Sequence, residues 1–289
     1  MSGAIGVGRT HRDKLDSLYD RYNRPEFVDP DPLAEIYRYD DIRDREIAAL
    51  VASSLAYGKA RQIVRSLSTV FEVMPFPVRY LKDATRQTLE DDFSGFRHRW
   101  TSGDEVASLL WGIKVVIEEF GSLEACFTNG CSANDETVTR ALSRFSGELH
   151  ASSGIKKSSL LPDPRRGSAC KRLNLFLRWL VRKDSVDPGG WSGISPSRLV
   201  VPLDTHMHRI SRELGFTTRN QADMKTALEI TRVFRLINPE DPVRYDFSLT
   251  RFGIRSDLEV EEFFKNFPLT STPLPQGERK NNVQHDCSC

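Results

Sequence analysis

The chain has 289 residues, of which 39% are hydrophobic and 28% charged, and its 41 basic residues nearly balance its 40 acidic ones. This length is enough to bury a sizeable core, and the near-neutral charge neither favours nor excludes a polyanionic partner. No apolar run approaches the roughly 18 residues of a membrane span, and the N-terminus lacks an apolar signal core, so neither a membrane protein nor an exported one is predicted. Five scattered cysteines favour a cytoplasmic location.

Helical periodicity dominates the first half of the chain. Apolar residues recur at helical spacing between residues 42 and 74, and Gly58 interrupts them, so two helices joined at Gly58 are expected. Ser102-Gly103-Asp104 and Gly121 are start and stop signals for a further helix. The other segments predicted here are helices at 11–22, 106–120 and 136–149 and a turn-rich stretch at 23–32.

The second half continues in the same way after a long connector at 152–167. A stripe of Leu173, Phe176, Leu177, Leu180 and Val181 predicts an amphipathic helix. The remaining predicted segments are a loop at 187–191 and helices at 205–214, 223–236 and 260–264. No alternating strand pattern is present, so we predict an all-α protein. Residues 1–267 form its folded domain, and residues 268–289 form a disordered polar tail.

Basic residues concentrate between residues 155 and 183, where nine of them accompany the single acid Asp163. Such a stretch is either a phosphate-attracting surface or an ordinary solvated basic helix. Arg178 and Arg182 follow Lys171 at seven and eleven residues, so we expect these three cations on one face opposite the apolar stripe. The residues predicted to contact DNA are Arg165, Arg166, Gly167, Ser168, Arg172, Arg178 and Arg182.

Lys171 stands at the start of the predicted helix, in Gly167-Ser168-Ala169-Cys170-Lys171. With Ser168 as the N-cap, Lys171 would be the third helical residue, where the helix dipole and the neighbouring Arg172 disfavour an ammonium ion. A neutral amine is the form that acts as a nucleophile. The alternative interpretation is an ordinary exposed lysine.

Asp204 lies thirty-three residues further on, in Pro202-Leu203-Asp204-Thr205-His206. An aspartate at a helix start is a common N-cap, and this interpretation needs no function. The fixed approach from Pro202 and the cationic partner upstream favour a catalytic carboxylate instead, since an amine and a carboxylate held together can break an N-glycosidic bond.

Aromatic and imidazole groups supply candidates for a ligand pocket. Trp191 follows Pro-Gly-Gly in a loop, whereas Trp179 is expected in the core. His206 and His208 point to different faces of one helix, so they do not predict a metal site. Cys287 and Cys289 in the tail supply too few ligands for one, and we expect neither a metal nor a cofactor. The predicted pocket residues are Trp191, His206 and Tyr57.

Together, Gly167-Ser168-Ala169-Cys170-Lys171 and Val201-Pro202-Leu203-Asp204-Thr205-His206 resemble motifs of the helix-hairpin-helix (HhH-GPD) base-excision DNA glycosylase superfamily. The gap between them is similar to that of its archaeal 8-oxoguanine branch. The nearest resemblance, over residues 10–265, is to a largely bacterial family with the same Gly-Ser-Ala-Cys-Lys-Arg-Leu-Asn and Pro-Leu-Asp-Thr-His motifs.

The resemblance implies two packed helical subdomains with a cleft between them. It places Lys171 on the lysine that forms a Schiff base and Asp204 on the catalytic aspartate. The implied activity is a DNA glycosylase with associated AP lyase, acting on oxidised purines such as 8-oxoguanine. The expected partner is double-stranded DNA with a damaged base or an abasic site, bound by a monomeric, nucleoid-associated cytoplasmic protein.

The chain departs from this superfamily at its hairpin, where Leu-Pro-Gly-x-Gly is replaced by residues 161–167, so neither the hairpin's phosphate-binding amides nor its monovalent cation carry over. The four-cysteine iron–sulfur loop of some members is absent from the sequence. Two other functions fit the same residues: a non-catalytic protein that binds DNA structures on this scaffold, and a helical protein–protein module in which Asp204 is only a cap.

Overall fold

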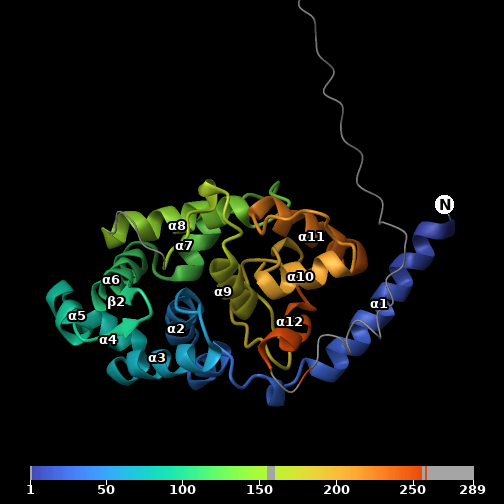
Figure 1. Ribbon diagram of the computed structural model, residues 1–289. Coiled ribbons are helices and arrows are strands. Elements are labelled where there is room, and N and C mark those ends of the chain that lie inside the picture. Colours follow the sequence, from blue (N-terminus) through green and yellow to red (C-terminus); the bar gives the residue numbers. More distant parts are fainter. Residues whose placement is uncertain (1, 155–159, 256–257, 259–289) are drawn as a thin grey trace, which may run out of the picture.

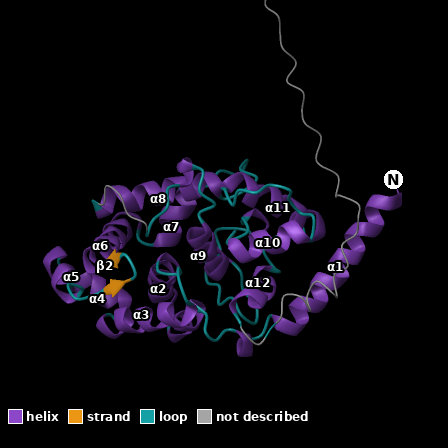
Figure 2. Cartoon of the chain, in the orientation of Figure 1, coloured by secondary structure: helices purple, strands orange, loops and turns teal. Residues whose placement is uncertain are grey.

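The computed structural model describes residues 2–154, 160–255 and 258. Within these ranges the chain forms twelve α-helices, four short 3-10 helices and one two-stranded hairpin (Figures 1 and 2). The prediction of an all-α protein is therefore confirmed. None of the described helices has the length and apolar character needed to cross a membrane. The helix predicted at 260–264 and the tail predicted at 268–289 lie outside the described residues.

The described elements have the following bounds. The 3-10 helices span Pro25–Phe27, Pro32–Arg38, Pro164–Arg166 and Pro196–Arg198, and the hairpin pairs β1 (Arg97–His98) with β2 (Thr101–Ser102). The α-helices are α1 (Ser2–Tyr22), α2 (Ile42–Ser54), α3 (Ala60–Val73), α4 (Pro77–Asp83), α5 (Arg86–Asp92), α6 (Gly103–Phe120), α7 (Leu123–Asn129), α8 (Thr139–Ser153), α9 (Lys171–Val181), α10 (Thr205–Glu213), α11 (Met224–Ile237) and α12 (Asp246–Ile254).

Helix ends match the sequence signals closely. Ser102 caps α6 in a capping box with Glu105, and Gly121 ends that helix at a φ of 84°. The helices α4, α5 and α7 were not predicted, because seven residues are too few to show a helical period. Helix α12 also escaped prediction, since all of its residues from Asp246 to Phe252 are buried and it shows no polar face.

Helix α9 runs through the centre of the molecule, with α2–α8 on one side and α1 and α10–α12 on the other (Figure 1). Every residue from Leu173 to Val181 is buried, including the polar Asn174 and Arg178. The predicted helix is therefore confirmed, but the cationic face expected opposite its apolar stripe is not exposed, because α9 packs against α2 and lies within the core. The central helix thus sets how the two groups of helices face each other.

Candidate active site

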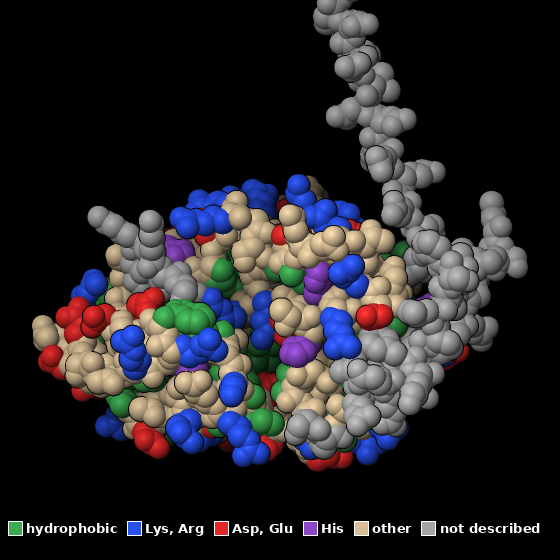
Figure 3. All heavy atoms as spheres, in the orientation of Figure 1, with side chains coloured by type: hydrophobic (Ala, Val, Ile, Leu, Met, Phe, Trp, Pro, Cys, Tyr) green, Lys and Arg blue, Asp and Glu red, His purple; other side chains and the backbone are tan. Residues whose placement is uncertain are grey.

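A cleft of about 740 Å³ opens at the start of α9. Most of its lining comes from five parts of the chain: residues 30–32, the loop at 56–60, the start of α9, the approach to α10, and α12. Lys171 and Asp204 both line it. Figure 3 shows a hollow near the centre of the molecule with Lys and Arg side chains gathered around it. The structure thus brings together the two residues on which the predicted chemistry depends.

Lys171 is the first residue of α9, so the predicted position of the N-cap is wrong. The cap is Cys170, in the left-handed region at a φ of 48°, and the Ser168 hydroxyl instead accepts a hydrogen bond from the Cys170 amide at 3.3 Å. The Lys171 side chain is half-buried and has neither a hydrogen bond nor an ion pair with another described residue. Its amine is therefore available to a ligand in the cleft.

Asp204 is an N-cap, as the simpler interpretation requires. Its Oδ1 accepts hydrogen bonds from the amides of His206 and Met207, both at 2.9 Å. The second oxygen, Oδ2, accepts no hydrogen bond from a described residue, and Asp204 is only partly buried. Capping therefore occupies one carboxylate oxygen and leaves the other for the cleft, so the two interpretations of Asp204 are compatible.

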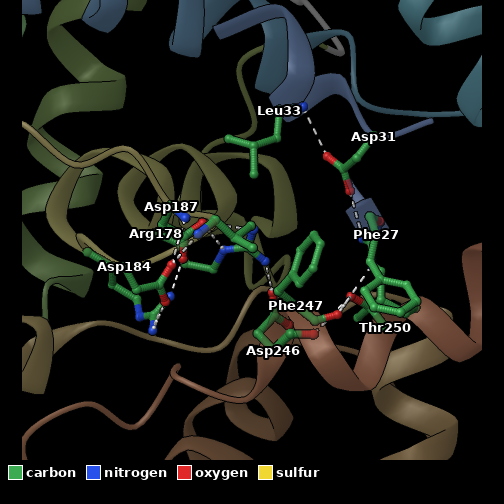
Figure 4. Close-up of polar contacts among 12 residues, drawn as sticks. Phe27, Asp31, Leu33, Arg178, Asp184, Asp187, Asp246, Phe247 and Thr250 are labelled. Atoms are coloured by element: carbon green, nitrogen blue, oxygen red, sulfur yellow. Dashed lines mark hydrogen bonds and ion pairs between the residues drawn. The ribbon is translucent and has the colours of Figure 1, made fainter. Parts of the chain in front are cut away.

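A buried ionic network adjoins the cleft, and two of its members, Arg178 and Asp246, form part of the cleft lining (Figure 4). Arg178 reaches from α9 to Asp246 on α12 at 2.5 Å and to Asp187 at 3.1 Å, and Arg182 binds Asp187 and Asp241. Arg178 is 2% exposed and Arg182 is 3% exposed. The prediction that these two arginines contact DNA is therefore wrong, because their charges are neutralised inside the protein and their guanidinium groups do not reach the surface.

Asp246 is a third ionisable group at the cleft, and sequence analysis missed it. Its Oδ2 binds Arg178, whereas its buried Oδ1 has no hydrogen-bond partner among the described residues. The pKa of Asp246 is raised to about 6, mainly by burial and also by the nearby charge of Asp204, while Arg178 and Lys171 act in the opposite direction. Nothing in the sequence distinguishes this aspartate from an ordinary acid at a helix start, since its environment is built by α9.

The turn before α9 presents exposed side chains, but its amides are already bonded. The Arg165 and Arg166 amides donate to Oδ1 and the carbonyl of Asp163, and the Gly167 amide donates to the Pro164 carbonyl. The Arg165 side chain also pairs with Asp163 at 3.0 Å. The exposed guanidinium group of Arg166, rather than the backbone of this turn, is therefore the group suited to a phosphate.

The other two predicted DNA contacts lie at the cleft itself. Ser168 is exposed, while Arg172 is half-buried and its Nη1 donates to the Ser54 carbonyl at 2.6 Å. The Arg172 guanidinium also lies 5.3 Å from the centre of the Tyr57 ring. Arg172 thus fixes the wall of the cleft to the end of α2.

Two of the three predicted pocket residues line the cleft. Tyr57 forms part of the wall beside Arg172, and the exposed His206 ring lies against α12 at Gly253, where an added Cβ would be 2.1 Å from Nδ1. Trp191 does not belong to the cleft: it is 4% exposed, and its Nε1 donates to Glu46 at 3.0 Å. The prediction for Trp191 is wrong because its loop folds back into the core.

Residues 31–255 match the model of a family described as a protein of unknown function, DUF2400. The chain belongs to this family. The match includes Lys171, Asp204 and Asp246, so the cleft is part of the family's common region. No curated protein and no solved structure matches the chain. The function of this DUF2400 protein must therefore be argued from the residues of its cleft.

Metal ligands do not gather at the DUF2400 cleft. Over the described ranges, no three His, Cys, Asp or Glu side chains lie close enough together to hold a metal ion. Cys287 and Cys289 lie outside those ranges. The ionisable groups that line the cleft include the amine of Lys171 and the carboxylates of Asp204 and Asp246.

Proposed function

We propose that this protein is a DNA glycosylase with associated AP-lyase activity, built on two helical subdomains of the HhH-GPD glycosylase type. The observation that carries the proposal is that Lys171 and Asp204, from separate helices, line one cleft, and that the lysine has no ion-pair partner among the described residues. A cleft of about 740 Å³ is within the usual range of small-ligand pockets and large enough for a nucleoside. The proposed substrate is duplex DNA with a damaged base, with 8-oxoguanine as the first to test.

In the proposed reaction, the damaged nucleotide leaves the duplex and enters the cleft, which costs a few kcal/mol of lost stacking and pairing. The Lys171 amine attacks the sugar C1′ as the bond from C1′ to the base breaks, and the base departs with the bonding electrons and takes up a proton. Oδ2 of Asp204 stabilises the positive charge that develops on the sugar. Opening of the sugar ring then gives a Schiff base between Nζ and C1′.

Strand cleavage follows from the Schiff base. Loss of a C2′ proton and departure of the 3′ phosphate break the strand, and hydrolysis of the imine returns the free lysine. Each of these steps needs a group that takes or gives a proton at the cleft. Asp246 is suited to this because its raised pKa of about 6 lies close to neutral pH and its Oδ1 has no partner among the described residues.

Borohydride trapping tests the proposal, because borohydride reduces a Schiff base to a stable protein–DNA adduct. We expect wild-type protein to form the adduct with a duplex containing an intact lesion, and Lys171→Gln to form none. Lys183→Gln is the matched control, since Lys183 is exposed and does not line the cleft. The duplex should carry an intact lesion rather than an abasic site, because abasic sites react with many amines.

The outcomes separate the three functions. Trapping that persists in Lys171→Gln would assign the nucleophile to another residue. An absence of both trapping and base release across a panel of lesions, with DNA affinity retained, would favour the non-catalytic DNA-binding protein. An absence of salt-dependent DNA affinity would favour the protein–protein module.

A further inference from the structure

The hairpin of β1 and β2 carries a solvent-exposed indole at its tip. The pairing of His98 with Thr101 leaves Arg99 and Trp100 as the two turn residues, and Trp100 is 58% exposed. Figure 3 shows hydrophobic side chains at the surface over this hairpin, beside the central hollow. An exposed indole at the margin of a cleft offers a flat face on which an aromatic ligand can stack.

Trp100 is held in a fixed position by the wall of the cleft. Its ring stacks on that of Tyr57 with centroids 4.8 Å apart and planes inclined by 21°. The Tyr57 hydroxyl donates to the His98 carbonyl at 2.9 Å and lies 2.5 Å from the Thr101 hydroxyl. Tyr57 lines the cleft, and Trp100 packs on the Tyr57 ring. Trp100 therefore lies at the margin of the cleft.

The base of the hairpin is anchored by a buried histidine. Nε2 of His98 lies 3.0 Å from the Tyr57 carbonyl, which can only accept, so Nε2 carries the proton and Nδ1 accepts from the Ser66 hydroxyl at 2.9 Å. Burial lowers the pKa of His98 and favours this neutral form. The hairpin therefore presents Trp100 without having to be ordered first, which reduces the entropy lost when a ligand binds.

Arginine side chains flank the two stacked rings. The Arg99 guanidinium lies 4.8 Å from the Trp100 ring centre, and that of Arg172 lies 5.3 Å from the Tyr57 ring centre. Arg99 is exposed, and an exposed cation–π contact is weaker than the stacking of a nucleobase on an aromatic ring. A base can therefore displace the Arg99 guanidinium, which is then placed to bind the adjoining phosphate.

We propose that the tip of the hairpin is a stacking site for an unpaired nucleobase of a DNA strand at the margin of the cleft. Aromatic rings flanked by arginines suit single-stranded nucleic acids, since every base has a face that can stack and every nucleotide has a phosphate. This inference rests on the proposed function only in taking DNA as the ligand. It does not require chemistry at Lys171.

The test is the affinity for a fluorescently labelled single-stranded oligothymidylate, measured by anisotropy at several salt concentrations. Trp100→Ala should weaken binding on the order of tenfold. The dependence of affinity on salt should keep its slope, because no charge is removed. Trp100→Phe should retain most of the affinity. Phe76→Ala is the matched control, since Phe76 is 63% exposed but does not line the cleft.

Unchanged affinity in Trp100→Ala would overturn the inference, as would an equal loss in Phe76→Ala or a wild-type protein that does not bind the oligonucleotide. Failure of the proposed chemistry has a different signature. In that case neither an adduct nor base release is found with wild-type protein, while Trp100→Ala still weakens oligothymidylate binding.

Discussion

The closed end and the mouth of the cleft use the same residue types in opposite ways. At the closed end, Arg178 is buried and forms ion pairs with both Asp187 and Asp246. At the mouth, Lys171 has no hydrogen bond or ion pair with another described residue, and Asp204 keeps one oxygen outside its capping bonds. Arg178 and Lys171 belong to one helix, seven residues apart.

This difference shows that charge in a sequence does not indicate function until its partners are known. A buried cation with two carboxylate partners is part of the architecture, since removing the cation leaves its carboxylates without it in a medium of low polarity. A half-buried cation with no hydrogen-bond or ion-pair partner among the described residues can contact a ligand in the cleft. The following predictions test whether the two ends of the cleft differ in this way.

The largest effect on stability is expected from Arg178→Met. The change leaves Asp187 and Asp246 buried without their shared cation, so the free energy of unfolding should fall by about 3–5 kcal/mol. The control is Arg166→Met at the exposed turn. This variant should change the free energy of unfolding by no more than about 0.5 kcal/mol. Urea unfolding of both variants measures the contrast, and equal small losses would mean that the network contributes little.

The second prediction concerns pH and Asp246. Because burial raises the pKa of Asp246 in the folded state to about 6, the folded protein binds a proton more tightly than the unfolded chain does. Its contribution to stability is therefore present at low pH and is lost as the pH rises from about 4 to about 6. Relative to Asp246→Asn, the wild-type free energy of unfolding should fall by up to roughly 3 kcal/mol over this window.

Urea unfolding of wild type and Asp246→Asn at pH 4, 5, 6 and 7 measures this difference directly. Comparing the two proteins at each pH removes the contributions of the other carboxylates, provided that these titrate alike in both. A difference that stays constant with pH would contradict the raised pKa of Asp246.

The third prediction separates the two roles of Asp204. Asparagine caps a helix nearly as well as aspartate, so Asp204→Asn should stay folded with a midpoint of thermal unfolding close to that of wild type. Base release should slow by about 100-fold, or about 2.7 kcal/mol in the barrier, because the carboxylate charge is lost. Single-turnover assays measure the rate of base release. A near-normal rate would mean that Asp204 acts only as a helix cap.

Local sequence signals gave most of the helices correctly. The break at Gly58, the capping box at Ser102 and the stop at Gly121 depend on backbone geometry within a few residues, and the structure confirms each. Asp204 and Lys171 were identified as a pair from motif resemblance, and the cleft contains both. The assignment of Arg178 and Arg182 failed because periodicity gives the face of a helix but not what covers that face.

The sequence by itself determined the all-α class, the helix starts at Asp204 and near Lys171, and the nature of the groups that those starts carry, because these depend on local hydrogen bonding and propensity. Tertiary structure alone decided that Trp191 lies in the core, that Asp246 joins the cleft, and that Trp100 stacks on Tyr57 at its margin. These outcomes depend on contacts between residues tens to more than a hundred positions apart, and whether a charge or a ring is buried is a property of the whole packing.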